Sequence, residues 1–314
     1  RRQRQMCIRD SAIYYGQDRD PAKRLRLEQD RQTIVLFETQ QTTEKQITIV
    51  KYSEAEYAAC GIVSIEITDE VNPGEEILLS PPVHKKRQIE FFGDSITCGY
   101  GVEGDVSDEI FDTADENPTK SYSLLTAELL DAEPNLVSWN GKGVITAYIG
   151  EEEDAQIDDS WLMPMLYEYT DAGLERDYFA NEQSDWETWN FEEYKPQLVV
   201  IYLGTNDASY TRDIPDRQKQ FEDAYVKLLH QVHEHNPNAA IITTIGAMDQ
   251  RLNTTIDAAT ACFAKVTPDC TIRYVQLPLQ DEVDGLGTYW HPTEKTNRKC
   301  ARLIADAAKE MLQW

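Results

Sequence analysis

The feature that most constrains the fold is the alternation of strand-like and helix-like segments that begins after Arg87. Short apolar runs alternate with longer segments of helical periodicity, an order typical of parallel α/β architecture. The runs predict strands at Ile89–Phe92, Asn135–Trp139, Leu198–Leu203, Ala240–Ile245 and Thr271–Gln276. The periodic segments predict helices at Ser121–Leu130, Arg217–Glu234, Thr255–Val266 and Thr293–Leu312. We therefore expect a three-layer αβα sandwich around a parallel five-stranded sheet, with right-handed crossovers.

The chain before Arg87 has a different character. Its β-branched or alternating segments predict strands at Gln32–Phe37, Lys45–Lys51 and Gly61–Ile67. Because no amphipathic helix intervenes, residues 12–83 are expected to form a small all-β sandwich that lacks its first strands. Residues 84–87 read as a linker, since paired prolines precede this run of charges. Residues 88–314 then form the α/β domain.

The first residues are treated separately. Residues 1–11 (RRQRQMCIRDS) are basic and poor in apolar residues, unlike the chain that follows. They read like the translation of a transposase sequencing adapter, and we exclude them from the fold argument. On this interpretation the natural N-terminus is missing, so the sequence carries no information about a signal peptide.

Charge narrows the class of partner. The 56 acidic and 30 basic side chains give a formal net charge of -26. Nucleic acids and anionic membrane surfaces demand basic patches, so this charge argues against both. It suits an uncharged partner, such as a sugar. No apolar stretch approaches the length of a membrane span.

Ser95 is the first candidate for chemistry. The apolar run before it ends in Gly93-Asp94-Ser95, which places the serine at the carboxyl end of a strand, where ligands bind in open α/β sheets. A serine hydroxyl becomes an effective nucleophile when a nearby base takes its proton. Taken alone, the three residues favour an ordinary Asp-Ser helix cap over a nucleophile.

Two later segments bring further polar residues to the same edge. Gly204-Thr205-Asn206-Asp207 follows the buried run Leu198–Leu203, so the Asn206 amide is placed to donate to a developing oxyanion. His291 lies in the loop before the last predicted helix, where it can act as a base. The alternatives are that Asn206 only closes a turn and that His291 is a capping or packing residue.

Together these segments resemble the SGNH (GDSL-type) hydrolases. The four matching blocks, in order, are Gly93-Asp94-Ser95, Gly141 within SWNGKG, Asn206 within GTND, and His291. The resemblance is closer still to carbohydrate esterase family 2, through FFGDSITCGYG, the NGKG turn, MPMLY, LGTND, WHPT and the upstream segment IVKYSEA. It covers nearly all of the chain after residue 11. It implies an SGNH fold, flavodoxin-like in outline, preceded by a jelly-roll-like β-sandwich.

The resemblance also implies an activity and roles. Ser95 is the expected nucleophile and His291 the base, with the Ser95 N–H, the Gly141 N–H and the Asn206 side chain as the oxyanion hole. The implied reaction is deacetylation of plant-wall polysaccharides or oligosaccharides, such as xylan or glucomannan, often at sugar 6-O positions. No metal or cofactor is needed for this chemistry. Secretion is implied by the resemblance and by a polymeric substrate.

The sequence departs from the triad pattern at one position. Many SGNH enzymes carry an aspartate three residues before the histidine, and here that residue is Thr288. Either a backbone carbonyl orients His291, giving a Ser–His dyad, or a carboxylate such as Asp284 or Asp281 does so. We favour the dyad, because members of the resembled family can lack the acid.

Several residues are candidates for binding substrate. Trp290 could stack on a sugar ring or simply pack at a strand end. The acidic, aromatic-rich segment Gly150–Tyr194 could extend this platform or form a small core of its own. The remaining candidates are Asp94, Asp207, Trp161 and Tyr167. Two other functions stay open: an SGNH lipase or thioesterase for longer acyl chains, and a noncatalytic glycan-binding protein.

Overall fold

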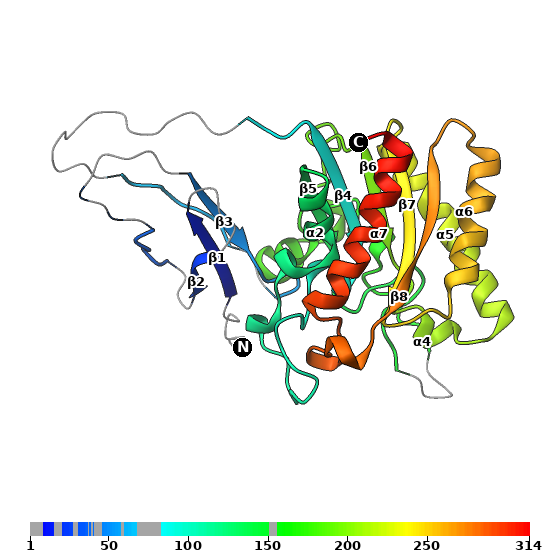
Figure 1. The fold of residues 1–314 in the computed structure, drawn as a ribbon, viewed down its shortest axis with the longest axis horizontal. Helices are drawn as coiled ribbons and strands as arrows, with labels where there is room; N and C mark the ends of the chain where they lie inside the picture. The colour runs from blue at the N-terminus through cyan, green and yellow to red at the C-terminus, as the bar shows by residue number, and fades with distance from the viewer. Residues whose placement is uncertain are drawn as a thin grey trace.

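The larger part of the molecule is a five-stranded parallel sheet between helices (Figure 1). The computed structural model describes residues 9–15, 21–27, 31–36, 38, 40, 46–57, 60–67, 83–150 and 156–314. The strands are β4 (Arg87–Gly93), β5 (Ala132–Ser138), β6 (Leu198–Tyr202), β7 (Ala240–Ala247) and β8 (Ile272–Leu279). All five overlap the predicted strands, so the expected α/β sheet is confirmed.

The strand order places the functional edge. The sheet runs β5-β4-β6-β7-β8, so the order reverses between β4 and β6, the kind of point at which ligands bind in doubly wound folds. In the ladder, Gly93 at the end of β4 pairs with Ser138 of β5 and Tyr202 of β6. The loops that follow these three strands therefore leave the sheet at one level.

Two helix pairs cover the sheet. Helix α2 packs against α7, and α5 packs against α6; Figure 1 shows the pairs on opposite faces. The four helices are α2 (Tyr122–Leu129), α5 (Pro215–His235), α6 (Asn253–Val266) and α7 (Glu294–Leu312). The predicted apolar stripe of α5 is buried at Phe221, Tyr225, Leu228, Leu229 and Val232. Burial of such a stripe holds each helix on the sheet.

Short helical turns occupy the connections. They are α1 (Ser95–Cys98), η1 (Thr113–Asp115), η2 (Pro118–Lys120), α3 (Met163–Leu166), the π-helical η3 (Leu174–Phe179), η4 (Gln183–Asp185), α4 (Ala208–Thr211), η5 (Glu282–Asp284) and η6 (Thr288–Trp290). Several of them lie in two long segments between the predicted strands and helices, residues 102–120 and 150–194. These segments are thus built from turns rather than from a sixth strand or long helix in the described part of the chain.

A second, three-stranded antiparallel sheet lies in the N-terminal part. Its order is β2-β1-β3, with β1 (Arg9–Tyr15), β2 (Pro21–Leu27) and β3 (Ile47–Lys51). Only β3 matches a predicted strand. The prediction was wrong for residues 32–36 and 61–67, which have no regular structure; Phe37 lies outside the described residues. Residues 9–11, set aside in the sequence argument, pair with residues 25–27, while residues 1–8 lie outside the described part.

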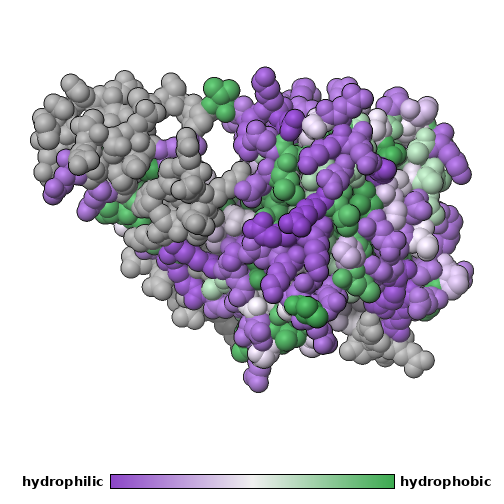
Figure 2. All heavy atoms as spheres, in the orientation of Figure 1, coloured by the Kyte–Doolittle hydropathy of each residue, from purple (hydrophilic) through white to green (hydrophobic). Residues whose placement is uncertain are grey.

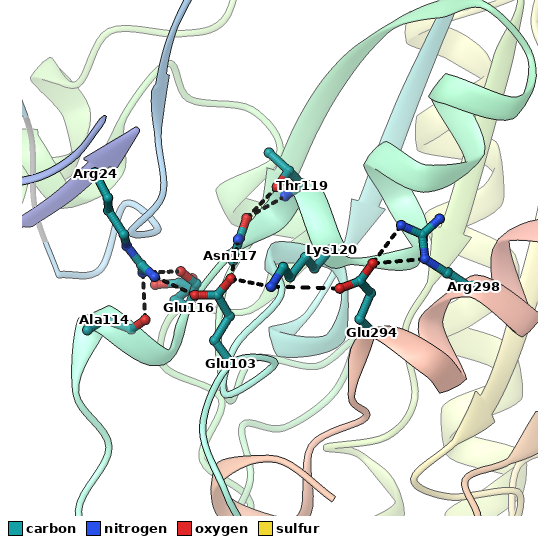
Figure 3. Close-up of polar contacts among 9 residues, drawn as sticks. All are labelled: Arg24, Glu103, Ala114, Glu116, Asn117, Thr119, Lys120, Glu294 and Arg298. Atoms are coloured by element: carbon teal, nitrogen blue, oxygen red, sulfur yellow. Dashed lines mark hydrogen bonds and ion pairs between the residues drawn. The ribbon is translucent and has the colours of Figure 1, made fainter. Parts of the chain in front are cut away.

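Polar contacts tie this sheet to the α/β domain. Arg24 of β2 donates to the carbonyl oxygens of Ala114 (2.5 Å) and Glu116 (3.2 Å), and its guanidinium pairs with Glu103. Figure 3 shows the chain of contacts continuing through Lys120, which lies 2.7 Å from Glu103, to Glu294 at the start of α7. The N-terminal sheet is therefore anchored to the loops that precede α2.

The surface has the character that the net charge predicts. On the face in Figure 2, hydrophilic side chains cover most of the described surface, and hydrophobic residues are scattered among them. None of the described helices combines the length and apolar character needed to cross a bilayer.

Candidate active site

Ser95 lies at a sharp turn between β4 and α1. Gly93 is required there, because a Cβ on it would come within 2.0 Å of Thr97 Oγ1 and 2.9 Å of the Tyr202 carbonyl oxygen. Asp94 caps α1 by accepting the Ile96 N–H at 3.1 Å. Ser95 is the first residue of α1, so its N–H has no acceptor within the helix. The turn thus presents, from one residue, a hydroxyl and an N–H that the helix does not use.

His291 meets Ser95 at hydrogen-bond distance. Its Nε2 lies 2.9 Å from Ser95 Oγ, and its Nδ1 lies 3.0 Å from the carbonyl oxygen of Thr288. A carbonyl only accepts, so Nδ1 must carry the proton, which leaves Nε2 free to accept from the serine. Both side chains are buried, at 4% and 8% exposure. This is the geometry of a serine and its base.

The backbone turn directly before His291 has an unusual conformation and orients the histidine side chain. Tyr289 and Trp290 both have positive φ, 52° and 60°, which non-glycine residues rarely adopt. The Gly101 carbonyl accepts the Thr288 N–H at 3.1 Å, and Gln280 Nε2 donates to the Trp290 carbonyl at 2.7 Å. Such conformations persist where the surroundings fix them, and they cluster at functional sites.

Burial keeps His291 neutral. The side chain packs against Tyr100, with ring centroids 4.7 Å apart, and burial lowers its pKa to about 4. The carbonyl of Thr288 opposes this shift, since it stabilises the imidazolium. At neutral pH the ring is therefore an unprotonated base.

The expected oxyanion donors lie in adjacent loops. Gly141 adopts φ 71°, and its N–H has no acceptor among the described residues. Asn206 Nδ2 donates to the Lys142 carbonyl at 2.9 Å, and its other close partner is Asp94 Oδ2 at 3.5 Å. This contact joins the β6 loop to the β5 loop that carries Gly141. The two loops are thus held together beside Ser95.

The prediction that Asp94, Asp207 and Tyr167 bind substrate was wrong, because their side chains are buried and hydrogen bonded within the protein. Asp94 is the α1 cap; burial raises its pKa to about 7. Asp207 accepts the N–H groups of Val144 and Ile145 at 2.9 and 2.7 Å, and burial raises its pKa to about 6. Tyr167 donates to Glu90 at 2.5 Å inside the core. They shape the loops and do not face a substrate.

The alternative in which Asp284 orients His291 is also wrong. The Asp284 carboxylate pairs with Lys299, and the Asp284 carbonyl accepts from Thr293 Oγ1 at 2.8 Å. Asp281 instead caps η5 by accepting the Val283 N–H. No carboxylate of the described residues hydrogen bonds to His291, whose Nδ1 is taken by Thr288.

The two tryptophan candidates differ in setting. Trp290 is part of the strained turn, directly precedes His291 and is 60% exposed. Trp161 packs against Trp186 at 5.0 Å, and the Arg176 guanidinium lies 4.0 Å from its ring centroid. It also borders a surface hollow with Leu162 and Gln183 that includes neither Ser95 nor His291. Trp290 is thus the candidate with an open face near the dyad.

Sequence reasoning missed two contributors. One is Tyr100, which lies in the quoted FFGDSITCGYG block and stacks on Phe111 as well as packing on His291. The other is the segment around Glu54, which reaches the Gly141 loop. Glu54, Cys98 and Glu116 also form one buried group whose ligand-type atoms lie within 4.8 Å of one another. The resemblance of IVKYSEA to the family was the available signal for this segment.

Comparison with protein families identifies a hydrolase family in the chain. The family described as GDSL-like Lipase/Acylhydrolase matches residues 91–299. Among curated proteins, the Cellulase/esterase CelE of Acetivibrio thermocellus is 33% identical over 247 residues, 77% of this chain and 28% of that protein. An Acetylxylan esterase / glucomannan deacetylase of Cellvibrio japonicus is 27% identical over 298 residues, 95% of this chain and 75% of that protein.

Solved structures give the same picture. A family two carbohydrate esterase from Clostridium thermocellum, in complex with cellohexaose, superposes with a TM-score of 0.79 at 26% identity, covering 98% of this chain and 87% of that one. The acetyl xylan esterase Est2A of Butyrivibrio proteoclasticus shares the fold, with a TM-score of 0.81 at 22% identity, covering 98% and 84%. The chain spans little more than a quarter of CelE, so only that portion is compared.

Proposed function

Since the chain belongs to the GDSL-like lipase/acylhydrolase family, and its relatives include family 2 carbohydrate esterases, we propose that it is a serine esterase that removes O-acetyl groups from plant cell-wall polysaccharides or oligosaccharides. Membership makes it a carboxylic ester hydrolase. The observation that carries the proposal is the Ser95 Oγ–His291 Nε2 distance of 2.9 Å, with Nδ1 bound to the Thr288 carbonyl.

The first half of the reaction acetylates the enzyme. Ser95 Oγ attacks the acetyl carbonyl carbon while His291 Nε2 takes the hydroxyl proton. The carbonyl oxygen becomes an oxyanion, which the Ser95 N–H, the Gly141 N–H and the Asn206 amide stabilise. The C–O bond to the sugar then breaks, and the imidazolium gives its proton to the leaving sugar oxygen.

The second half restores the enzyme. Water attacks the acetyl–Ser95 ester while His291 Nε2 accepts a proton from it, and the same donors hold the second oxyanion. The bond to Ser95 Oγ breaks, the imidazolium returns its proton to Oγ, and acetic acid leaves and ionises to acetate in solvent. The low pKa of His291 supports this role, because the ring is free to accept a proton in each half.

The carbohydrate substrate is inferred from the relatives. The names of the Cellvibrio proteins specify acetylated xylan and glucomannan, and the clostridial structure holds cellohexaose. We propose xylan or glucomannan as the polymer class, with 6-O acetyl groups among the targets, and secretion as the location. We also propose that residues 12–83 belong to a jelly-roll-like β-sandwich, residues 84–87 to a linker and residues 88–314 to the hydrolase domain.

The test is acetate release by wild type and Ser95→Ala. We expect wild type to hydrolyse 4-nitrophenyl acetate and acetylated xylan or glucomannan, and Ser95→Ala to lose both activities. A series of 4-nitrophenyl esters from acetyl to octanoyl then tests the acyl group. Preference for octanoyl would identify a lipase instead, and binding of the polymer without hydrolysis would identify a glycan-binding protein.

A further inference from the structure

The segment from Lys51 to Tyr57 lies between the N-terminal sheet and the candidate site. It follows β3 directly, and Tyr52, Ser53 and Glu54 are buried at 2%, 3% and 7% exposure. Lys51 Nζ fixes its turn by donating to the carbonyl oxygens of Ser53 (2.6 Å) and Glu54 (3.1 Å). A buried, clamped turn at a domain boundary holds its side chains in fixed positions.

Glu54 reaches across to the loop that carries Gly141. Its Oε2 accepts the backbone N–H of Asn140 at 2.5 Å, one residue before the proposed oxyanion donor. The side-chain Nδ2 of Asn140 also contacts the Tyr57 hydroxyl at 3.4 Å. Residues 54 and 57 therefore hold both the backbone and the side chain of Asn140.

The other supports of this loop come from the α/β domain. Tyr148 N–H donates to the Gly141 carbonyl at 2.8 Å, Asn206 Nδ2 donates to the Lys142 carbonyl at 2.9 Å, and Met163 N–H donates to the Gly143 carbonyl at 3.0 Å. Each of these fixes a carbonyl after the Asn140 N–H. Glu54 fixes the side of the turn that enters Gly141, and Tyr148 fixes the side that leaves it.

Glu116 holds Glu54 in this position. Glu116 Oε2 accepts the Glu54 N–H at 3.2 Å, and Glu116 itself is fully buried. The groups that face the pair are Cys98, Lys51 and Glu56. Burial raises both pKa values, and the Glu116 carboxylate raises that of Glu54 further, so the pair retains a proton at neutral pH. A neutral Glu54 carboxyl still accepts the Asn140 N–H through its carbonyl oxygen.

From these contacts we propose that Glu54 is a positioning residue for the esterase reaction, which holds the Asn140–Gly141 turn so that the Gly141 N–H points at the oxyanion. The inference rests on the proposed function. The inference gives the N-terminal segment a part in catalysis, although Glu54 contacts neither Ser95 nor substrate. A preorganised donor stabilises the oxyanion only when it is correctly placed. A loosened turn should therefore lower kcat and leave KM nearly unchanged.

The test compares three variants with wild type on 4-nitrophenyl acetate. Glu54→Leu removes the acceptor and should lower kcat by about 10- to 100-fold, with KM within about twofold, since removal of a whole oxyanion donor costs about 10²–10³. Glu54→Gln keeps an oxygen at the same reach and should stay within about threefold of wild type. Glu175→Leu is the matched control, because Glu175 is another buried carboxyl that accepts a backbone N–H, that of Glu187 at 3.3 Å, but it contacts neither Glu54 nor Asn140.

A second readout separates positioning from loss of structure. An alkylboronic acid that forms a tetrahedral adduct with Ser95 places an oxygen where the oxyanion forms. Its inhibition constant should rise in Glu54→Leu by about the same factor as kcat falls. In Glu54→Gln the inhibition constant should stay close to that of wild type. Thermal unfolding is measured for every variant. If Glu54→Leu does not fold, Glu54→Asp, which is one methylene too short to reach Asn140, replaces it.

The outcomes distinguish the two proposals. Activity that persists in Ser95→Ala overturns the proposed function itself. If wild type is active and Ser95→Ala is inactive, a folded Glu54→Leu with kcat within threefold of wild type overturns the role of Glu54 alone. Equal losses in Glu54→Leu and Glu175→Leu, or a loss with unchanged boronate inhibition, also overturn it.

Discussion

His291 is oriented by the backbone of its own loop: Nδ1 donates to the Thr288 carbonyl oxygen at 3.0 Å, at the position where many triads carry an aspartate. The main-chain N–H of His291 bonds to the same oxygen at 3.2 Å. A carbonyl fixes the tautomer as an aspartate would, but it carries no full charge. It therefore stabilises the imidazolium less, in agreement with the low pKa of the ring.

Replacement of the candidate acid tests this arrangement. Asp284→Asn should leave kcat within about tenfold of wild type, because the carboxylate pairs with Lys299 and does not reach the histidine. A true triad aspartate would cost about 10⁴. Steady-state kinetics on 4-nitrophenyl acetate decide between the two, and a loss near the larger figure would restore Asp284 as the acid.

The pH profile should follow His291. Only the neutral ring accepts the Ser95 proton, so kcat/KM should fall on the acid side with a midpoint near pH 4, the pKa that burial gives the ring. Because the unfolded chain binds the histidine proton already near pH 6.5, this group also lowers the free energy of unfolding as pH falls from about 6.5 to 4. A midpoint at pH 6–7, with the fold intact, would contradict the lowered pKa of His291.

A glycine supports the carbonyl that orients the histidine. A Cβ on Gly101 would lie 2.7 Å from the Thr288 carbonyl oxygen, and the residue has φ 66°. Gly101→Ala should displace this carbonyl and lower kcat by about 10- to 100-fold. Gly285→Ala is the control, since Gly285 also has a positive φ, 80°, but a Cβ on it would lie 3.5 Å from the nearest atom. Similar kinetics in both folded variants would show that the Thr288 carbonyl is unimportant.

Trp290 offers a test of sugar binding. Trp290 directly precedes His291 and is 60% exposed, so Trp290→Ala should raise KM for acetylated oligosaccharides by about fivefold, the loss of about 1 kcal/mol of aromatic contact. Hydrolysis of 4-nitrophenyl acetate, which has no sugar, should change by less than threefold. Unchanged KM for the oligosaccharide would assign Trp290 to packing alone.

Much of the α/β domain could be predicted because its signals are local. The run Leu198–Leu203 is apolar throughout and became the fully buried strand β6. The N-terminal sheet could not be predicted in the same way. Strand β2 reads RLRL at its end and is held by contacts such as Arg24 to Glu116, which join residues 92 apart in the chain. Residues 61–67 alternate like a strand, yet they have no regular structure.

The candidate site shows the same division. Ser95, Asn206 and His291 could be placed because each follows a strand or precedes a helix at one edge of the sheet. The direction of a neighbouring side chain could not, so Asp94 and Asp207 were assigned to substrate although both point into the protein. Glu54 was missed because its contact with Asn140 depends on how the two sheets pack.

The central claim is that Ser95 is the acyl acceptor and His291 its base. Its most direct test is mass spectrometry of the enzyme mixed rapidly with 4-nitrophenyl acetate and quenched in acid. We predict one added acetyl group, on the peptide that contains Ser95, and none in Ser95→Ala. An acetyl group on a different residue, or undiminished acetate release by Ser95→Ala, would contradict the account.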